Sequence, residues 1–131
     1  PDWDMGTAAC PIVGEADLRN PSVVKVVWGE QRQALYFSRS LIPFVRDNDL
    51  AVTHWRHLGL YAYRPAFLAR LVKTPPCLLE RAEKLEQLRA LHIGARMVVL
   101  EADEAGIGVD TPDDVAYVEK VLGHGGAAKR P

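Results

Sequence analysis

In five stretches of the chain, apolar residues cluster together or alternate with polar ones, as they do in β-strands. The segment 23–27, Val-Val-Lys-Val-Val, is rich in β-branched residues, and the glycine-containing loop 28–33 separates it from the aromatic segment 34–37. This spacing predicts an antiparallel hairpin. Further strands are predicted at 5–13, 57–63 and 97–100.

Helical signals fill much of the chain between and after these strands. The predicted helical segments are 15–20, 65–72, 78–93 and 112–123. Pro65 suits the first position of its helix, Gly94 suits the end of the longest one, and Thr111 is a good N-cap for the last. Strands and helices in this order indicate an α/β fold, with a partly parallel, mixed sheet, a hairpin extension and flanking helices.

The predicted strand 57–63 divides its side chains between two faces of the sheet. The two sets are Leu58, Leu60 and Ala62, and His57, Gly59, Tyr61 and Tyr63. We expect the leucine face to be the core. The other face carries an imidazole and two phenols beside a glycine, which suits a ligand platform. A histidine on a strand is also common as a hydrogen-bonded structural residue, so both interpretations of His57 remain open.

One carboxylate falls among the apolar positions of the predicted helix 78–93. The apolar arc comprises Leu78, Ala82, Leu85, Leu88 and Ile93. Glu80 and Lys84 form an i, i+4 pair on the opposite side. Glu86 lies within the arc, where a carboxylate loses several kcal/mol of hydration unless it is paired. Either Arg89 satisfies it, or the arc faces a ligand cavity in which Glu86 accepts hydrogen bonds from hydroxyl groups.

Two arginines follow the strand 34–37 in a segment with little other charge. Arg39 and Arg46 are seven residues apart, and Pro43 between them interrupts any strand. A guanidinium among apolar neighbours is suited to bidentate binding of a carboxylate or phosphate. The alternative is that each arginine pairs with a structural acid.

Asp110 stands at the end of a glycine-containing loop, just before the predicted cap of the last helix. It belongs to neither the capping geometry nor the core. Loop carboxylates of this kind are usually solvated, but they are also the usual magnesium ligands near phosphates. The pair Gly106-x-Gly108 lacks the third glycine of a dinucleotide fingerprint.

Composition narrows the class of protein. The chain of 131 residues accommodates at most one domain, and 25% charged with 48% apolar residues is ordinary for a globular protein. A net charge of −1 offers no electrostatic footprint for nucleic acid, and no apolar run approaches the roughly 20 residues that cross a bilayer. The two isolated cysteines form neither a disulfide framework nor a zinc motif, so we expect a cytoplasmic protein.

Several segments together resemble the sugar-acid cytidylyltransferases, and most closely the CMP-Kdo synthetases of lipopolysaccharide synthesis (Kdo is 3-deoxy-manno-octulosonate). The matching blocks are 23–27, 34–43, 57–64, 85–89 and 108–112, in the family's order and approximate spacing. The resemblance implies a Rossmann-like nucleotidyltransferase fold, transfer of CMP from CTP to Kdo with magnesium and release of pyrophosphate, and a homodimer to which the hairpin region contributes.

By motif match, the resemblance assigns roles to individual residues. The implied sugar-acid contacts are Arg39, Arg46, His57, Tyr61, Glu86 and Gln87, and the implied catalytic magnesium ligand is Asp110. Nothing in the chain matches the family's N-terminal half, which holds a triphosphate-binding loop and a second magnesium aspartate. We therefore interpret the chain as the C-terminal portion of such an enzyme, and expect it to be inactive alone.

Within this interpretation, residues 1–122 form the sugar-acid-binding and dimerisation portion, and residues 123–131 form a disordered tail. Two alternatives remain. The chain could derive from a relative that acts on another acidic sugar, such as a sialic acid. It could also be a non-catalytic sugar-acid-binding or dimerisation module.

Overall fold

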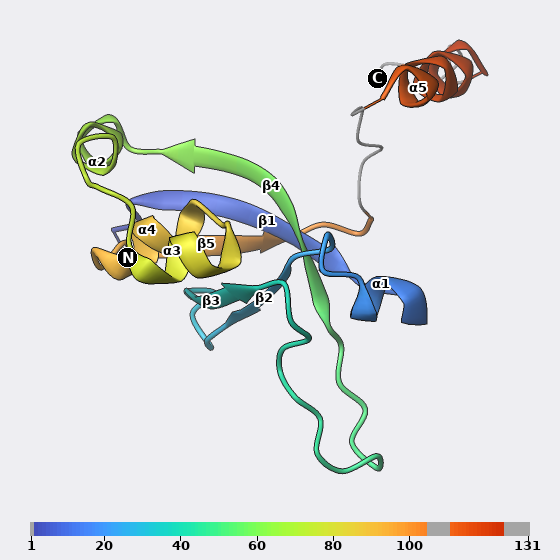
Figure 1. Ribbon diagram of the computed structural model, residues 1–131, viewed down its shortest axis with the longest axis horizontal. Coiled ribbons are helices and arrows are strands. Elements are labelled where there is room, and N and C mark those ends of the chain that lie inside the picture. The colour runs from blue at the N-terminus through green and yellow to red at the C-terminus, as the bar shows by residue number, and fades with distance from the viewer. Residues whose placement is uncertain (1, 105–110, 125–131) are drawn as a thin grey trace.

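The computed structural model describes residues 2–104 and 111–124, in which five strands form one sheet (Figure 1). The strands are β1 (Met5–Pro11), β2 (Lys25–Trp28), β3 (Ala34–Ser38), β4 (Trp55–Tyr63) and β5 (Met97–Glu101). Their order across the sheet is β3-β2-β4-β1-β5. β1 pairs in parallel with β5, whereas the other pairs are antiparallel. The prediction of a mixed sheet with a hairpin is confirmed.

The β2–β3 hairpin supplies the centre of the hydrophobic core. Val26 and Phe37 are fully buried and stand opposite each other in the antiparallel register. The tip of the hairpin reaches β5, where the Val99 N–H donates to the Arg32 carbonyl at 2.9 Å. The Arg32 guanidinium also lies 2.7 Å from the Glu101 carboxylate. These contacts bring β3 and β5, at the two ends of the strand order, close to each other.

Five helices accompany the sheet within the described residues. They are α1 (Glu15–Arg19), α2 (Pro65–Leu71), α3 (Leu78–Glu83), α4 (Gln87–His92) and α5 (Pro112–His124). In Figure 1, α3 and α4 lie against the sheet, whereas α5 lies apart from it. The predicted start of α5 is confirmed, because the Thr111 hydroxyl accepts the Asp114 N–H at 3.2 Å and the Asp114 carboxylate accepts the Thr111 N–H at 2.8 Å.

The prediction of one continuous helix over 78–93 is wrong. α3 ends at Glu83, and Lys84 takes the left-handed conformation with φ 55° and ψ 47°. This conformation costs a residue with a side chain about 1–2 kcal/mol, so contacts outside the helix must hold it. The predicted Glu80–Lys84 pair is also absent, because Glu80 is buried and bonded to Arg89.

The prediction that the leucine face of β4 is the core is wrong as well. Leu60 is 56% exposed, whereas His57 on the opposite face is only 8% exposed. Alternation shows that the two faces differ. The covered face is the one on which Phe37 lies edge-on to the His57 ring at 4.8 Å and Gln87 at the start of α4 approaches it. Gly59 has φ +70°, which favours glycine, beside a register irregularity between β1 and β4.

Residues 39–54 connect β3 to β4, and the part from 40 to 54, called the arm below, extends away from the sheet (Figure 1). The His54 Nε2–H donates to the Pro43 carbonyl at 3.0 Å across the base of the arm. Phe44 and Leu50 are 84% and 65% exposed. The arm therefore presents large apolar side chains to solvent.

Three further expectations bear on the class and extent of the domain. Over the described ranges, the chain contains no helix with the length and apolar character of a membrane span. Cys10 and Cys77 are free, buried thiols. The predicted disordered tail falls mostly on 125–131, which lie outside the described residues, while Gly123 and His124 belong to α5.

The exposed Leu60 of β4 and the buried Leu88 of α4 offer a matched pair of substitutions. Leu88→Ala removes a fully buried side chain and is expected to lower the free energy of unfolding by about 2–5 kcal/mol. Leu60→Ala changes an exposed side chain and is expected to stay within about 0.5 kcal/mol of the unmodified chain. Urea unfolding followed by circular dichroism at one protein concentration measures both. Comparable losses at the two positions would contradict the observed packing.

Candidate functional site

A cavity of about 190 Å³ lies where the end of β4 meets α2 and the start of α4. Its wall is formed by Met5, Tyr61, Tyr63, Leu68, Leu71, Val72, Glu86, Gln87, Arg89 and Ala90. Half of these residues are apolar and half carry hydroxyl, carboxylate, amide or guanidinium groups. Ligand cavities typically combine an apolar wall with a few polar groups of this kind.

Four residues predicted from the sequence meet at this cavity. Tyr61 and His57 come from β4, while Glu86 and Gln87 stand at the start of α4. Tyr61, Glu86 and Gln87 line the cavity, and His57 lies behind Gln87 with 3.5 Å between its Nδ1 and the amide Nε2. The rings of His57 and Tyr61 are 5.4 Å apart. Residues up to thirty positions apart thus form one cluster.

The hydrogen bonds around His57 fix its tautomer. The Thr7 hydroxyl has a single proton, which it donates to the Leu60 carbonyl at 2.7 Å. The His57 Nε2, 2.8 Å from the same hydroxyl oxygen, must therefore be the donor of that contact. This leaves His57 Nδ1 as the acceptor that faces the Gln87 amide.

Burial determines the charge of the cluster. It lowers the pKa of His57 to about 4, so the imidazole is neutral at pH 7. Burial also raises the pKa of the Tyr61 phenol, and the neighbouring Tyr63 and the Glu86 carboxylate raise it further. The pKa of Tyr63 is raised by two of these causes, burial first and then the Glu86 carboxylate. At neutral pH the two phenols and the imidazole are uncharged beside the Glu86 carboxylate.

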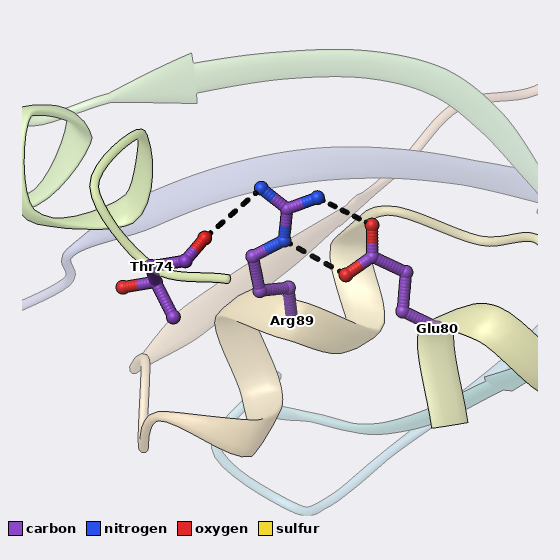
Figure 2. A network of polar contacts seen from close by, with 3 residues as sticks. All are labelled: Thr74, Glu80 and Arg89. Atoms are coloured by element: carbon purple, nitrogen blue, oxygen red, sulfur yellow. Dashed lines mark hydrogen bonds and ion pairs between the residues drawn. The ribbon is translucent and has the colours of Figure 1, made fainter. Parts of the chain in front are cut away.

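Figure 2 shows the ion pair that fastens α4 beside the cavity. The Arg89 Nε and Nη2 donate to the two carboxylate oxygens of Glu80 at 2.8 and 2.5 Å, and Nη1 donates to the Thr74 carbonyl at 3.3 Å. The hydrogen bonds from Arg89 lower the pKa of Glu80. Arg89 is thus engaged by Glu80, and Glu86 is exposed at the cavity instead of lying inside an apolar arc.

The structure places the two predicted arginines outside the cavity wall. Arg39 donates through its guanidinium to the carbonyls of Pro21, Glu83 and Lys84. Neither arginine is paired with a structural acid through its guanidinium in the described contacts. Arg46 is exposed on the arm, where it lines a separate hollow. The sugar-acid contacts implied for both arginines stay predictions.

The predicted magnesium ligand, Asp110, lies outside the described residues, as do Gly106 and Gly108. Among the residues at 2–104 and 111–124, no group of three or more His, Cys, Asp or Glu side chains could hold a metal ion. The magnesium prediction therefore continues to rest on Asp110 alone.

Sequence reasoning missed Thr7 and the apolar wall contributed by α2. Thr7 is 2% exposed on β1 and orients His57 from the neighbouring strand. Its signal was a polar residue at an inward position of an otherwise apolar strand. Leu68, Leu71 and Val72 gave no sequence signal, because helix residues that line a cavity look like core residues.

Comparisons with known proteins place this geometry in context. A family model described as "Cytidylyltransferase" matches residues 2–99. A 3-deoxy-manno-octulosonate cytidylyltransferase of Polynucleobacter necessarius is 50% identical over 121 residues, which cover 90% of this chain and 48% of that protein. The enzyme of the same name from Bdellovibrio bacteriovorus is 44% identical, with 93% of this chain and 51% of that protein covered.

A solved structure agrees with these matches. A CMP:2-keto-3-deoxy-manno-octonic acid synthetase complexed with CTP shares the fold with a TM-score of 0.87 at 37% sequence identity. The alignment covers 95% of this chain and 51% of that chain. The chain therefore spans about half the length of the curated relatives that it matches.

The buried, neutral His57 predicts a specific pH dependence of stability. Its pKa is about 4 when folded and 6.5 when exposed, so acidification through this window protonates the unfolded chain first and destabilises the fold. We expect the unmodified chain to lose roughly 3 kcal/mol more than His57→Gln between pH 6.5 and 4. Urea unfolding across this range measures it. The control His92→Gln, at an exposed position, should behave like the unmodified chain, and an unchanged slope in His57→Gln would refute the assignment.

Proposed function

The chain belongs to the cytidylyltransferase family, and we propose that it provides the sugar-acid-binding portion of an enzyme that transfers CMP from CTP to Kdo. The products are CMP-Kdo and pyrophosphate. The support comes from the named relatives and from one structural observation, the convergence of Tyr61, Glu86 and Gln87 on the cavity wall beside a neutral His57.

The chemistry of this wall suits a polyhydroxylated ligand. A carboxylate accepts hydrogen bonds from hydroxyl groups, and an amide both donates and accepts them. The tyrosine rings present an apolar body with a polar tip, which matches the carbon-bound hydrogens and hydroxyls of a sugar. His57 accepts from Gln87 and so orients its amide towards the ligand.

The charge at Glu86 determines how a sugar acid is oriented. Because like charges repel, the ligand's carboxylate points away from Glu86, and the hydroxyl-bearing part enters the cavity. We propose that Arg46 and Arg39 contact the carboxylate from outside the cavity wall. Both are the cations that the family resemblance assigns to the sugar acid.

CTP and magnesium belong to the proposal for the intact enzyme. The solved relative is a complex with CTP, and this chain spans about half of that protein. We propose that Asp110 holds magnesium, which would neutralise charge on the phosphates of CTP. The two free thiols agree with a reducing, cytoplasmic setting.

The alternative substrate is another acidic sugar, such as a sialic acid, and the alternative class is a non-catalytic binding module. The relatives that the chain resembles are named for Kdo, which favours this sugar acid. The relative affinities of the chain for Kdo and for a sialic acid distinguish the two substrates. A loss of affinity in a Glu86 variant would show that the sugar acid binds in the cavity.

Isothermal titration calorimetry of the 131-residue chain with Kdo tests the proposed site. We expect saturable binding, with N-acetylneuraminate binding more weakly and neutral mannose not competing. Glu86→Gln should weaken Kdo binding about ten-fold, because it removes a charged hydrogen-bond acceptor. The control Glu119→Gln changes an exposed carboxylate on α5 and should bind like the unmodified chain. Absence of saturable Kdo binding, or equal binding by Glu86→Gln, would contradict the proposal.

We further propose that the arm contributes to a homodimer. Its exposed Phe44 and Leu50 are large apolar side chains of the kind that two copies bury together. The double variant Phe44→Ser/Leu50→Ser should convert a dimer to a monomer, as measured by light scattering coupled to size exclusion. Leu60→Ser, which changes an exposed leucine on the sheet, is the matched control. A monomeric mass for the unmodified chain at micromolar concentrations would overturn this prediction.

A further inference from the structure

The junction between α3 and α4 determines where Glu86 and Gln87 stand. α3 ends at Glu83, the left-handed residue Lys84 turns the chain, and α4 begins at Gln87. Both cavity residues therefore follow the turn within three positions. Anything that holds the turn also sets the direction in which these two side chains point.

Glu83 ties this junction to the end of β3. Its carboxylate Oε1 accepts the Ser38 hydroxyl at 2.7 Å, and Oε2 accepts the Arg39 backbone N–H at 2.9 Å. The Ser38 hydroxyl in turn accepts the Ser40 N–H at 3.1 Å. The carboxylate thus bonds to groups more than forty residues earlier in the chain.

The Arg39 side chain in turn binds backbone carbonyls at the junction between α3 and α4. Its Nε donates to the Glu83 carbonyl at 2.7 Å, and its Nη2 donates to the Lys84 carbonyl at 3.2 Å. These carbonyls belong to the end of α3, where the helix leaves them without a helical partner. The Arg39 carbonyl is itself held by the fully buried Lys25, whose Nζ lies 3.1 Å away.

These contacts oppose the local preference of the sequence. The segment 78–93 is rich in Leu, Glu, Ala, Lys and Arg, which favour an uninterrupted helix. A lysine with φ +55° is disfavoured in isolation. In a continuous helix, Glu86 and Gln87 would follow the axis of α3 and would not take their observed positions at the cavity. The mutual bonds of Glu83 and Arg39 therefore stabilise the interrupted form.

We propose that Glu83 is a positioning residue for the sugar-acid site, acting through Arg39 and the turn at Lys84 on Glu86 and Gln87. This assignment rests on the proposed function for its ligand and on the hydrogen bonds at the junction for its geometry. It also gives Arg39 a role at the site through the backbone carbonyls that it binds, in addition to the predicted contact with the sugar acid.

The test compares Glu83→Gln with the double variant Glu83→Gln/Lys84→Gly. The amide keeps the size of the side chain but offers one acceptor oxygen where the carboxylate offers two. Glycine adopts φ +55° without a steric penalty and disfavours a continuous helix, so it restores the turn without restoring the carboxylate. Kdo binding is measured by calorimetry, and the backbone and Gln87 amide chemical shifts of the ligand-free chain are measured by NMR.

We expect Glu83→Gln to weaken Kdo binding roughly 10- to 100-fold, as a small displacement of binding groups does. The chemical shifts of residues 84–87 should move in the same variant. Adding Lys84→Gly should recover most of the lost affinity and return most of these shifts towards those of the unmodified chain. Glu86→Gln/Lys84→Gly is the matched control. Because Glu86 contacts the ligand itself, glycine should give no recovery there.

The outcomes separate the two proposals. If the unmodified chain binds no Kdo, the proposed function fails, but the NMR comparison of ligand-free chains still decides whether Glu83 holds the turn. Unchanged shifts of residues 84–87 in Glu83→Gln, or a loss of binding that Lys84→Gly does not recover, overturns the positioning role. Should Glu83→Gln fail to fold, Ser38→Ala removes one of the two bonds to the carboxylate and gives the same comparison.

Discussion

The burial of His57 between Phe37 of β3 and Gln87 at the start of α4 is the constraint on which the candidate site depends. It desolvates His57, which lowers the pKa of the imidazole and leaves Nδ1 as an acceptor facing the Gln87 amide. Because α4 begins only at Gln87, the adjoining part of the same face, at Tyr61, remains open as a cavity wall. The same packing therefore leaves His57 buried and Tyr61 accessible at the cavity.

Two arginine clamps hold the short helices α3 and α4. α3 and α4 have six residues each, which is too short for either helix to be stable alone. Arg89 binds Glu80 and the Thr74 carbonyl, while Arg39 binds the Pro21, Glu83 and Lys84 carbonyls. A guanidinium has five donors in a rigid arrangement, so it satisfies several acceptors that a lysine would leave unmet.

The sequence by itself determined most of the strands and helices and the types of side chain that meet at the cavity. β-branched residues at 23–27 and aromatic residues at 34–37 predicted the hairpin, and Pro65 and Thr111 marked helix starts that the structure confirms. The family resemblance singled out His57, Tyr61, Glu86 and Gln87, which the fold brings together. The predictions of the hairpin and of the two helix starts succeeded because propensity and capping are local properties of the chain.

Only the tertiary structure decided which side of β4 is buried, where the helix over 78–93 breaks, and what Arg39 and Arg89 bind. Alternation along β4 distinguishes two faces, but Phe37 of β3 and Gln87 of α4 bury the His57 face. Helix propensity favours continuity at Lys84, and bonds from Arg39, over forty residues earlier, stabilise the turn instead. Periodicity records only neighbours along the chain, whereas burial and hydrogen-bond partners depend on segments that meet after folding.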